Sequence, residues 1–191
     1  MNRELFYISN QISLLRILLI IPTVYLLLYK PEESYSTAII IVLLVTMYIT
    51  DLLDGYLARR LDQVSETGKI LDPLADKIVV VAIVLILFLQ HKIETWFFVI
   101  VITRDIMILI FGLYLKSRKR IVLMSNYPGK AAVLSIGIIM LLTIINTQNT
   151  ELLDALIRYM YYVSVMLILY SLILYFMRFK KSIGDKSYDR Q

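Results

Sequence analysis

Cysteine is absent from this 191-residue chain, and histidine occurs once. The lack of cysteine excludes a disulfide framework and every metal site built from thiolates. The single histidine, His91, stands in a short polar stretch and is expected to be a connecting residue rather than a catalytic one. Charged residues make up only 18% of the chain, whereas hydrophobic residues make up 59%. Soluble domains are roughly 45–50% apolar, so this composition favours a membrane protein.

Long apolar runs recur along the chain, and roughly six of them approach the ~20 residues needed to cross a bilayer. Because lipid offers the backbone no hydrogen-bond partners, these runs are expected to be helices. The sequence therefore predicts an all-α integral membrane bundle of roughly six transmembrane helices, forming a single domain over 1–191. Residues 1–10 are expected to form a short amphipathic helix rather than a cleaved signal. The expected spans are 12–29, 36–58, 70–90, 94–115, 129–146 and 153–177.

Basic residues are concentrated in alternate connections between these runs, and the net charge is +5. The positive-inside rule therefore places both termini and the connection after the second span on the cytoplasmic side of the membrane. Basic clusters beside apolar runs suit anionic lipid and phosphate-bearing substrates, and no nucleic-acid partner is expected. The residues that carry this asymmetry are Arg59, Arg60, Lys69, Lys116, Arg118, Lys119, Arg120, Arg178, Lys180 and Lys181.

Four aspartates stand at the ends of two apolar runs, at positions 51, 54, 72 and 76. A carboxylate at a bilayer centre costs roughly 2.5–3.5 kcal/mol on insertion scales. Asp51 and Asp54 are spaced to share one helix face, and Asp72 and Asp76 are spaced to share another. An antiparallel hairpin would bring the two faces together, where the charges would repel unless neutralised. Clustered carboxylates of this kind favour a site for one or two Mg²⁺ or Mn²⁺ ions.

The same segment reads D-x-x-D-G-x-x-A-R, then eight residues, then G-x-x-x-D-x-x-x-D. This pattern resembles the signature of the CDP-alcohol phosphotransferase family, also called CDP-alcohol phosphatidyltransferase class I, at every fixed position. The chain length and the number of apolar runs are similar to the family as well. The matching positions are Asp51, Asp54, Gly55, Ala58, Arg59, Gly68, Asp72 and Asp76.

The resemblance implies a reaction in which an acceptor alcohol attacks CDP-diacylglycerol, takes its phosphatidyl group and releases CMP. It implies two Mg²⁺ or Mn²⁺ ions, held mainly by Asp51, Asp54 and Asp72. Asp76 is then both a ligand of the second metal and the general base for the acceptor hydroxyl. A homodimer is expected from the resemblance alone. The residues expected to line the CDP pocket are Gly55, Ala58, Arg59 and Gly68.

Upstream, S-N-Q-I-S-L-L-R from Ser9 to Arg16 resembles a P-N-x-x-T-x-x-R element found near the start of such enzymes. Asn10 is expected to lie near the nucleotide, with helix capping as the alternative. The element keeps Arg16, to which the sequence assigns no role.

Cations in or beside the apolar runs are candidates for binding an acceptor that carries phosphate. Arg104 stands inside an apolar run, where a charge is usually functional. Its neighbour Asp105 is expected to compensate it only in part, because adjacent residues do not share a helix face. Lys130 is expected at a helix start, and Arg118 and Lys119 complete the candidates. A topology signal is the alternative for the last two.

Glycerol 3-phosphate is the favoured acceptor, because L-D-P-L-A-D-K and P-G-K resemble bacterial phosphatidylglycerophosphate synthases. Those enzymes typically carry Arg-Glu where this chain has Arg104-Asp105, which is more similar to CMP-forming cardiolipin synthases that use phosphatidylglycerol. An inositol phosphate is a further alternative. A membrane prenyltransferase and a divalent-cation transporter fit less well, because the carboxylates gather on one hairpin and no internal repeat is visible.

Overall fold

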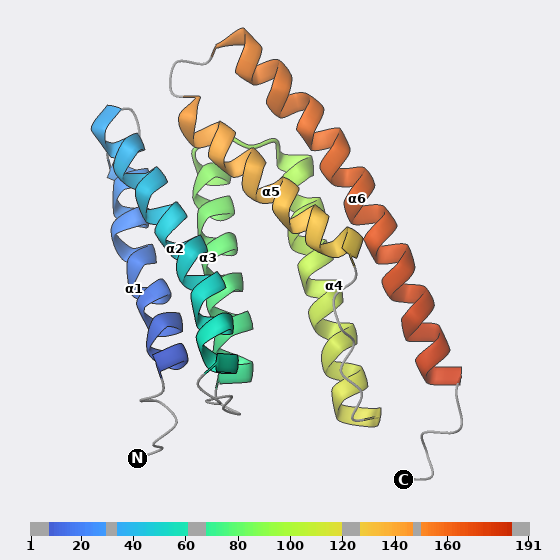
Figure 1. The fold of residues 1–191 in the computed structure, drawn as a ribbon. Coiled ribbons are helices and arrows are strands. Elements are labelled where there is room, and N and C mark those ends of the chain that lie inside the picture. Colours follow the sequence, from blue (N-terminus) through green and yellow to red (C-terminus); the bar gives the residue numbers. More distant parts are fainter. Residues whose placement is uncertain (1–7, 30–33, 61–67, 120–126, 147–149, 185–191) are drawn as a thin grey trace. The chain divides into compact units, whose positions relative to one another are not determined.

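Every regular element in the described part of this computed structural model is an α-helix (Figure 1). The structure describes residues 8–29, 34–60, 68–119, 127–146 and 150–184. Within these helices, the side chains at 8–10, 34, 52, 54–60, 68–74, 76, 112–119 and 181–184 lie outside the described part. The helices are α1 (Ile8–Tyr29), α2 (Ser34–Arg60), α3 (Gly68–Leu89), α4 (Thr95–Lys119), α5 (Tyr127–Ile145) and α6 (Glu151–Gly184).

The predicted all-α class is confirmed, and each helix overlaps one of the expected spans. The amphipathic helix expected over 1–10 falls largely on residues 1–7, which lie outside the described residues, and α1 begins at Ile8. The chain divides into two compact units, Met1–His91 and Lys92–Gln191. Each unit contains three of the helices.

In the first unit, several polar residues of α1 are buried, and many of its apolar residues are exposed. Ser13, Arg16 and Thr23 are at most 2% exposed, whereas Leu18 and Ile21 are 59% and 63% exposed. A helix in water would be arranged the other way round. Apolar outer faces of this kind indicate a membrane protein, because hydrocarbon tolerates them and does not solvate charge.

The buried face of α1 packs against both α2 and α3. Its buried residues recur every three or four positions, which is the spacing of a single helix face. Facing side chains on α2 and α3 complete an apolar core. The buried residues of this first unit are Ser13, Arg16, Ile20, Thr23 and Leu27 from α1, Ser36, Ile40 and Met47 from α2, and Ala75, Ile83, Val84, Ile86 and Leu87 from α3.

In the second unit, α6 packs mainly against α5 and also contacts α4. The ring centroids of Phe97 on α4 and Tyr161 on α6 lie 4.5 Å apart. The buried hydroxyls of Ser135 on α5 and Ser164 on α6 are hydrogen-bonded at 2.9 Å. Small polar residues at a helix contact allow close approach and supply interhelical hydrogen bonds, as is common in membrane bundles.

The amide side chain of Asn146, just after α5, contacts residues at the start of α6. Its Oδ1 accepts a hydrogen bond from the Thr150 backbone N–H at 2.9 Å. Its Nδ2 donates to Oδ1 of Asp154 in the first turn of α6 at 2.7 Å. An acidic residue in the first turn also favours the helix start through the helix dipole.

Three described helical stretches are long and apolar enough to cross a membrane: Gln11–Tyr29, Tyr127–Ile145 and Glu151–Lys180. Two shorter apolar stretches are Tyr35–Asp51 and Lys77–Leu89. The shorter stretches belong to α2 and α3, where the signature aspartates interrupt the apolar run at one end.

Candidate functional site

The signature segment occupies the last turns of α2 and the first turns of α3. Asp51 and Asp54 belong to α2, which ends at Arg60. Asp72 and Asp76 belong to α3, which begins at Gly68. The prediction that the aspartates lie on two helices, on either side of one connection, is therefore confirmed for the backbone.

Two contacts fix the directions of the three helices of the first unit. Nη1 of Arg16, early in α1, lies 3.1 Å from Oδ1 of Asp51, late in α2. At the other end of α1, the Leu27 carbonyl accepts a hydrogen bond from Nε2 of Gln90, just beyond α3. Helix α2 is thus antiparallel to α1, and α3 is parallel to α1 (Figure 1). The start of α1, the end of α2 and the start of α3 therefore lie at the same end of this unit.

All the residues predicted for metal and CDP binding lie on these three helix ends. Asp51 is the one whose side chain is described, and it is 39% exposed. The side chains of the others lie outside the described part: Asn10, Asp54, Gly55, Ala58, Arg59, Gly68, Asp72 and Asp76.

Carboxylates at this end of the unit suit a hard divalent cation, since Mg²⁺ and Mn²⁺ prefer oxygen ligands. Asp51 is exposed enough to offer an oxygen to such an ion. The described side chains include no group of three or more potential metal ligands. The fit of a divalent cation to this end of the unit is argued from the oxygen donors of the four aspartates and from the helix ends on which they lie.

Arg16 is a residue that sequence reasoning left without a role. Its side chain is 2% exposed and forms an ion pair with Asp51, the first signature aspartate. Two features single out Arg16, although neither predicts its partner. Arg16 belongs to the resemblance upstream of the signature, and it falls on the same three-to-four spacing as the buried residues Ser13 and Ile20.

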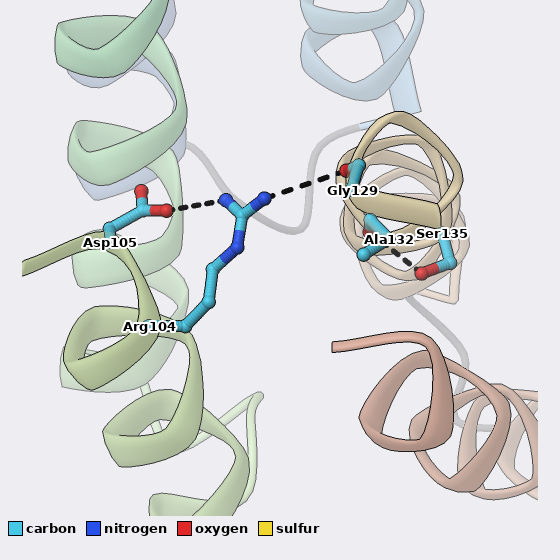
Figure 2. Close-up of polar contacts among 5 residues, drawn as sticks. All are labelled: Arg104, Asp105, Gly129, Ala132 and Ser135. Atoms are coloured by element: carbon cyan, nitrogen blue, oxygen red, sulfur yellow. Dashed lines mark hydrogen bonds and ion pairs between the residues drawn. The ribbon is translucent and has the colours of Figure 1, made fainter. Parts of the chain in front are cut away.

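The second unit has its own buried arginine, Arg104 on α4 (Figure 2). Its Nη1 lies 2.6 Å from Oδ1 of Asp105. Its Nη2 donates a 3.5 Å hydrogen bond to the Gly129 carbonyl in the first turn of α5. The ion pair forms although Arg104 and Asp105 do not share a helix face, because the long arginine side chain turns its guanidinium back to the neighbouring carboxylate. Nε of Arg104 is buried and has no hydrogen-bond partner among the described residues.

The other cations proposed for the acceptor lie at helix ends of the second unit. Lys130 follows Gly129 in the first turn of α5, and its side chain is exposed. Arg118 and Lys119 belong to the last turn of α4, and their side chains lie outside the described part. The structure thus brings Arg104 to the residue that precedes Lys130.

The family profile described as CDP-alcohol phosphatidyltransferase matches residues 6–177. The chain belongs to the CDP-alcohol phosphatidyltransferase family. It is accordingly a transferase of phospholipid biosynthesis, and its family transfers phosphatidyl groups with release of CMP. The resemblance read from the signature is confirmed.

Similar proteins from bacteria carry two kinds of name. A CDP-diacylglycerol–glycerol-3-phosphate 3-phosphatidyltransferase of Aquifex aeolicus is 34% identical over 179 residues, which cover 92% of this chain and 97% of that protein. An enzyme of the same name from Pseudomonas fluorescens is 46% identical over 90 residues, covering 47% of this chain and 44% of that enzyme. A Mycobacterium tuberculosis protein, provisionally named a cardiolipin synthase, is 33% identical over 125 residues, covering 65% of this chain and 58% of that protein.

Proposed function

We propose that this protein transfers the phosphatidyl group of CDP-diacylglycerol to glycerol 3-phosphate and releases CMP. The observation that carries the proposal is the similarity to the Aquifex aeolicus enzyme, whose name describes this reaction. The similarity extends over 97% of that enzyme. The intact signature on the ends of α2 and α3 supports the same conclusion.

In the proposed reaction, the acceptor hydroxyl oxygen forms a bond to the β-phosphorus, and the bond from that phosphorus to the CMP oxygen breaks. Asp76 takes the hydroxyl proton, which requires it to lie within hydrogen-bond reach of the acceptor. Asp51, Asp54 and Asp72 hold the metal, with Asp76 on a second ion. When bound, Mg²⁺ or Mn²⁺ supplies charge stabilisation at the phosphate oxygens.

The proposed nucleotide pocket lies at the same end of the first unit. Gly55, Ala58 and Gly68 are small, so they leave room for the cytidine and the diphosphate beside the backbone. Arg59 supplies a cation for phosphate, and Asn10 supplies amide donors and acceptors for the base.

Acceptor selection is assigned to cations of the second unit. Lys130 is exposed in the first turn of α5, where backbone N–H groups also favour a phosphate. Arg104 binds the carbonyl next to Lys130, and Arg118 and Lys119 end α4. Together they form the proposed binding residues for the acceptor phosphate.

The proposal includes the membrane arrangement predicted from the sequence. All six helices cross the bacterial cytoplasmic membrane, both termini and the signature end face the cytoplasm, and two copies form a homodimer. The apolar outer face of α1 and the excess of Lys and Arg at one side support this arrangement. The family match across 6–177 includes residues of both units, which supports the single family domain predicted for the chain.

Phosphatidylglycerol is the second candidate acceptor, with formation of cardiolipin. The similarity to the Mycobacterium tuberculosis protein and the Arg104-Asp105 pair favour it. An inositol phosphate is a third candidate for which no described contact argues.

The proposal is tested by CMP release from purified protein, CDP-diacylglycerol and Mg²⁺, with each acceptor supplied in turn. We expect release with glycerol 3-phosphate, and a lipid product with one additional phosphate. Release with phosphatidylglycerol alone would replace the acceptor and keep the reaction class. No release with any alcohol would contradict the proposal.

Replacing the proposed base separates chemistry from binding. Asp76→Asn should lower kcat by about 10²–10⁴-fold, the usual contribution of general-base catalysis. Binding of CDP-diacylglycerol, measured with a nonreacting acceptor analogue, should fall much less. An unchanged kcat would remove Asp76 as the base.

A further inference from the structure

Arg16 is a cation in one of the least exposed places in the described structure. Its side chain is 2% exposed, and it is among the largest fully buried side chains of the described residues. A buried charge is costly unless it is paired and hydrogen-bonded. Its position within the core of the first unit therefore calls for a function that an apolar residue of similar size would not supply.

The partner of Arg16 lies on a different helix and is itself a signature residue. Nη1 of Arg16 is 3.1 Å from Oδ1 of Asp51. Asp51 is 39% exposed, so its carboxylate is held on the inner side and remains accessible on the outer side. A carboxylate held in this way has fewer rotamers to lose when it binds a ligand.

The packing of α1 and α2 places both side chains. Arg16 follows Ser13 by three residues and precedes Ile20 by four, so it belongs to the buried face of α1. Asp51 follows the buried residue Met47 on α2 by four positions, so it continues the inward face of that helix. The ion pair is thus built into the helix contact rather than formed by two surface chains.

We infer that Arg16 is a positioning residue that orients the Asp51 carboxylate for metal binding. The inference rests on the proposed function, in which Asp51 is a metal ligand. Arg16 itself touches neither metal nor substrate in this scheme. Residues that orient metal ligands typically change metal affinity by 10–100-fold when they are replaced.

A positioning role and a competing role for Arg16 predict opposite changes in metal affinity when Arg16 is replaced. A guanidinium attracts the carboxylate beside it and repels a nearby metal ion, so an Arg16 that competed with the metal would weaken metal binding by Asp51. Removing a competitor would tighten metal binding, whereas removing a positioning residue would weaken it.

The test is Mn²⁺ binding to detergent-purified protein, followed by the loss of the free Mn²⁺ electron paramagnetic resonance signal. Arg16→Gln should weaken Mn²⁺ binding by about 10–100-fold. Arg16→Lys keeps the charge but loses the planar fork, so it should weaken binding by several-fold, on the order of 3–10. Thr23→Val, which changes another buried polar residue of the same α1 face, is the matched control and should bind Mn²⁺ as the wild type does.

A kinetic measurement separates positioning from a loss of folded protein. For both Arg16 variants, the metal concentration for half-maximal CMP release should rise, and kcat at saturating metal should stay near the wild-type value. A purely structural role would lower the folded fraction and leave that metal concentration unchanged.

The outcomes distinguish this inference from the proposed function. A wild-type protein that binds no Mn²⁺ and releases no CMP would overturn the proposed function. A wild-type protein that binds Mn²⁺ would leave that function standing, and equal or tighter binding by Arg16→Gln would overturn the inference. If Arg16→Gln does not fold, Arg16→Lys decides, because wild-type Mn²⁺ affinity in that variant would also overturn it.

Discussion

Each unit of this protein contains a buried arginine paired with an aspartate, and the two pairs differ in kind. Arg16 reaches across a helix contact to Asp51, a residue of the signature. Arg104 reaches the adjacent residue Asp105, and its contact with another helix is a 3.5 Å hydrogen bond to the Gly129 carbonyl. The first pair joins two helices through charge, whereas the second pair is local and adds a weaker link to α5.

The exposure of the two carboxylates differs as well. Asp51 is 39% exposed, but Asp105 is 15% exposed. A buried ion pair whose members are both shielded loses most when one partner is removed. A pair with one exposed member keeps that member available for another ligand. We therefore expect the pair of the first unit to matter more for catalysis and the pair of the second unit to matter more for stability.

The largest expected effect comes from removing the charge of Asp51, and the matched variant removes the charge of Asp105. Asp51→Asn should lower kcat/KM for CMP release on the order of 10³-fold, because a metal contributes several kcal/mol and each 1.36 kcal/mol is tenfold. Asp105→Asn keeps an oxygen that accepts a hydrogen bond and should lower kcat/KM by less than about 10-fold. Equal losses in the two variants, measured at saturating Mg²⁺, would remove the difference between the pairs.

The stability of the two arginine variants should follow the reverse order. Arg104→Met leaves a shielded carboxylate and should cost about 3–5 kcal/mol of unfolding free energy. Arg16→Met leaves a carboxylate that water reaches, so it should cost about 1–3 kcal/mol. Thermal unfolding in detergent, monitored by circular dichroism without added metal, measures both. A larger loss for Arg16→Met would contradict the expectation that the Arg104–Asp105 pair contributes more to stability than the Arg16–Asp51 pair.

The smallest expected effect concerns acceptor binding beside the Gly129 contact. Lys130→Gln should raise the KM for glycerol 3-phosphate by about 10-fold, the lower end for a charge-assisted hydrogen bond because Lys130 is exposed. The KM for CDP-diacylglycerol should not change. Lys180→Gln, which alters an exposed cation on α6, is the control. An unchanged acceptor KM in Lys130→Gln would remove this residue from the acceptor site.

The helices were predictable because membrane spans leave a direct signal in the sequence. Apolar runs such as 12–29 and 129–146 correspond to α1 and α5 within a few residues at each end. The placement of the four signature aspartates on two helices was predictable because their spacings of three and four residues fit one face of a helix. The family match followed from the same fixed positions.

The two ion pairs were less predictable because each depends on side-chain reach. A spacing rule relates residues on one helix face, so it does not indicate that Arg16 meets Asp51 on another helix. The same rule argued against full compensation of Arg104 by Asp105, but a long side chain bends back to its neighbour. The contact of Arg104 with Gly129 involves a backbone carbonyl, which leaves no mark on residue type.

The central claim is most directly tested by measuring both products of one reaction. Wild-type protein is supplied with CDP-diacylglycerol and glycerol 3-phosphate, and CMP and phosphatidylglycerophosphate are quantified with Mg²⁺ and with a chelator. We predict equal amounts of the two products with Mg²⁺ and neither product with the chelator. Release of CMP without the lipid product would contradict a phosphatidyl transfer. Product yields with the chelator that match those with Mg²⁺ would contradict its dependence on a metal.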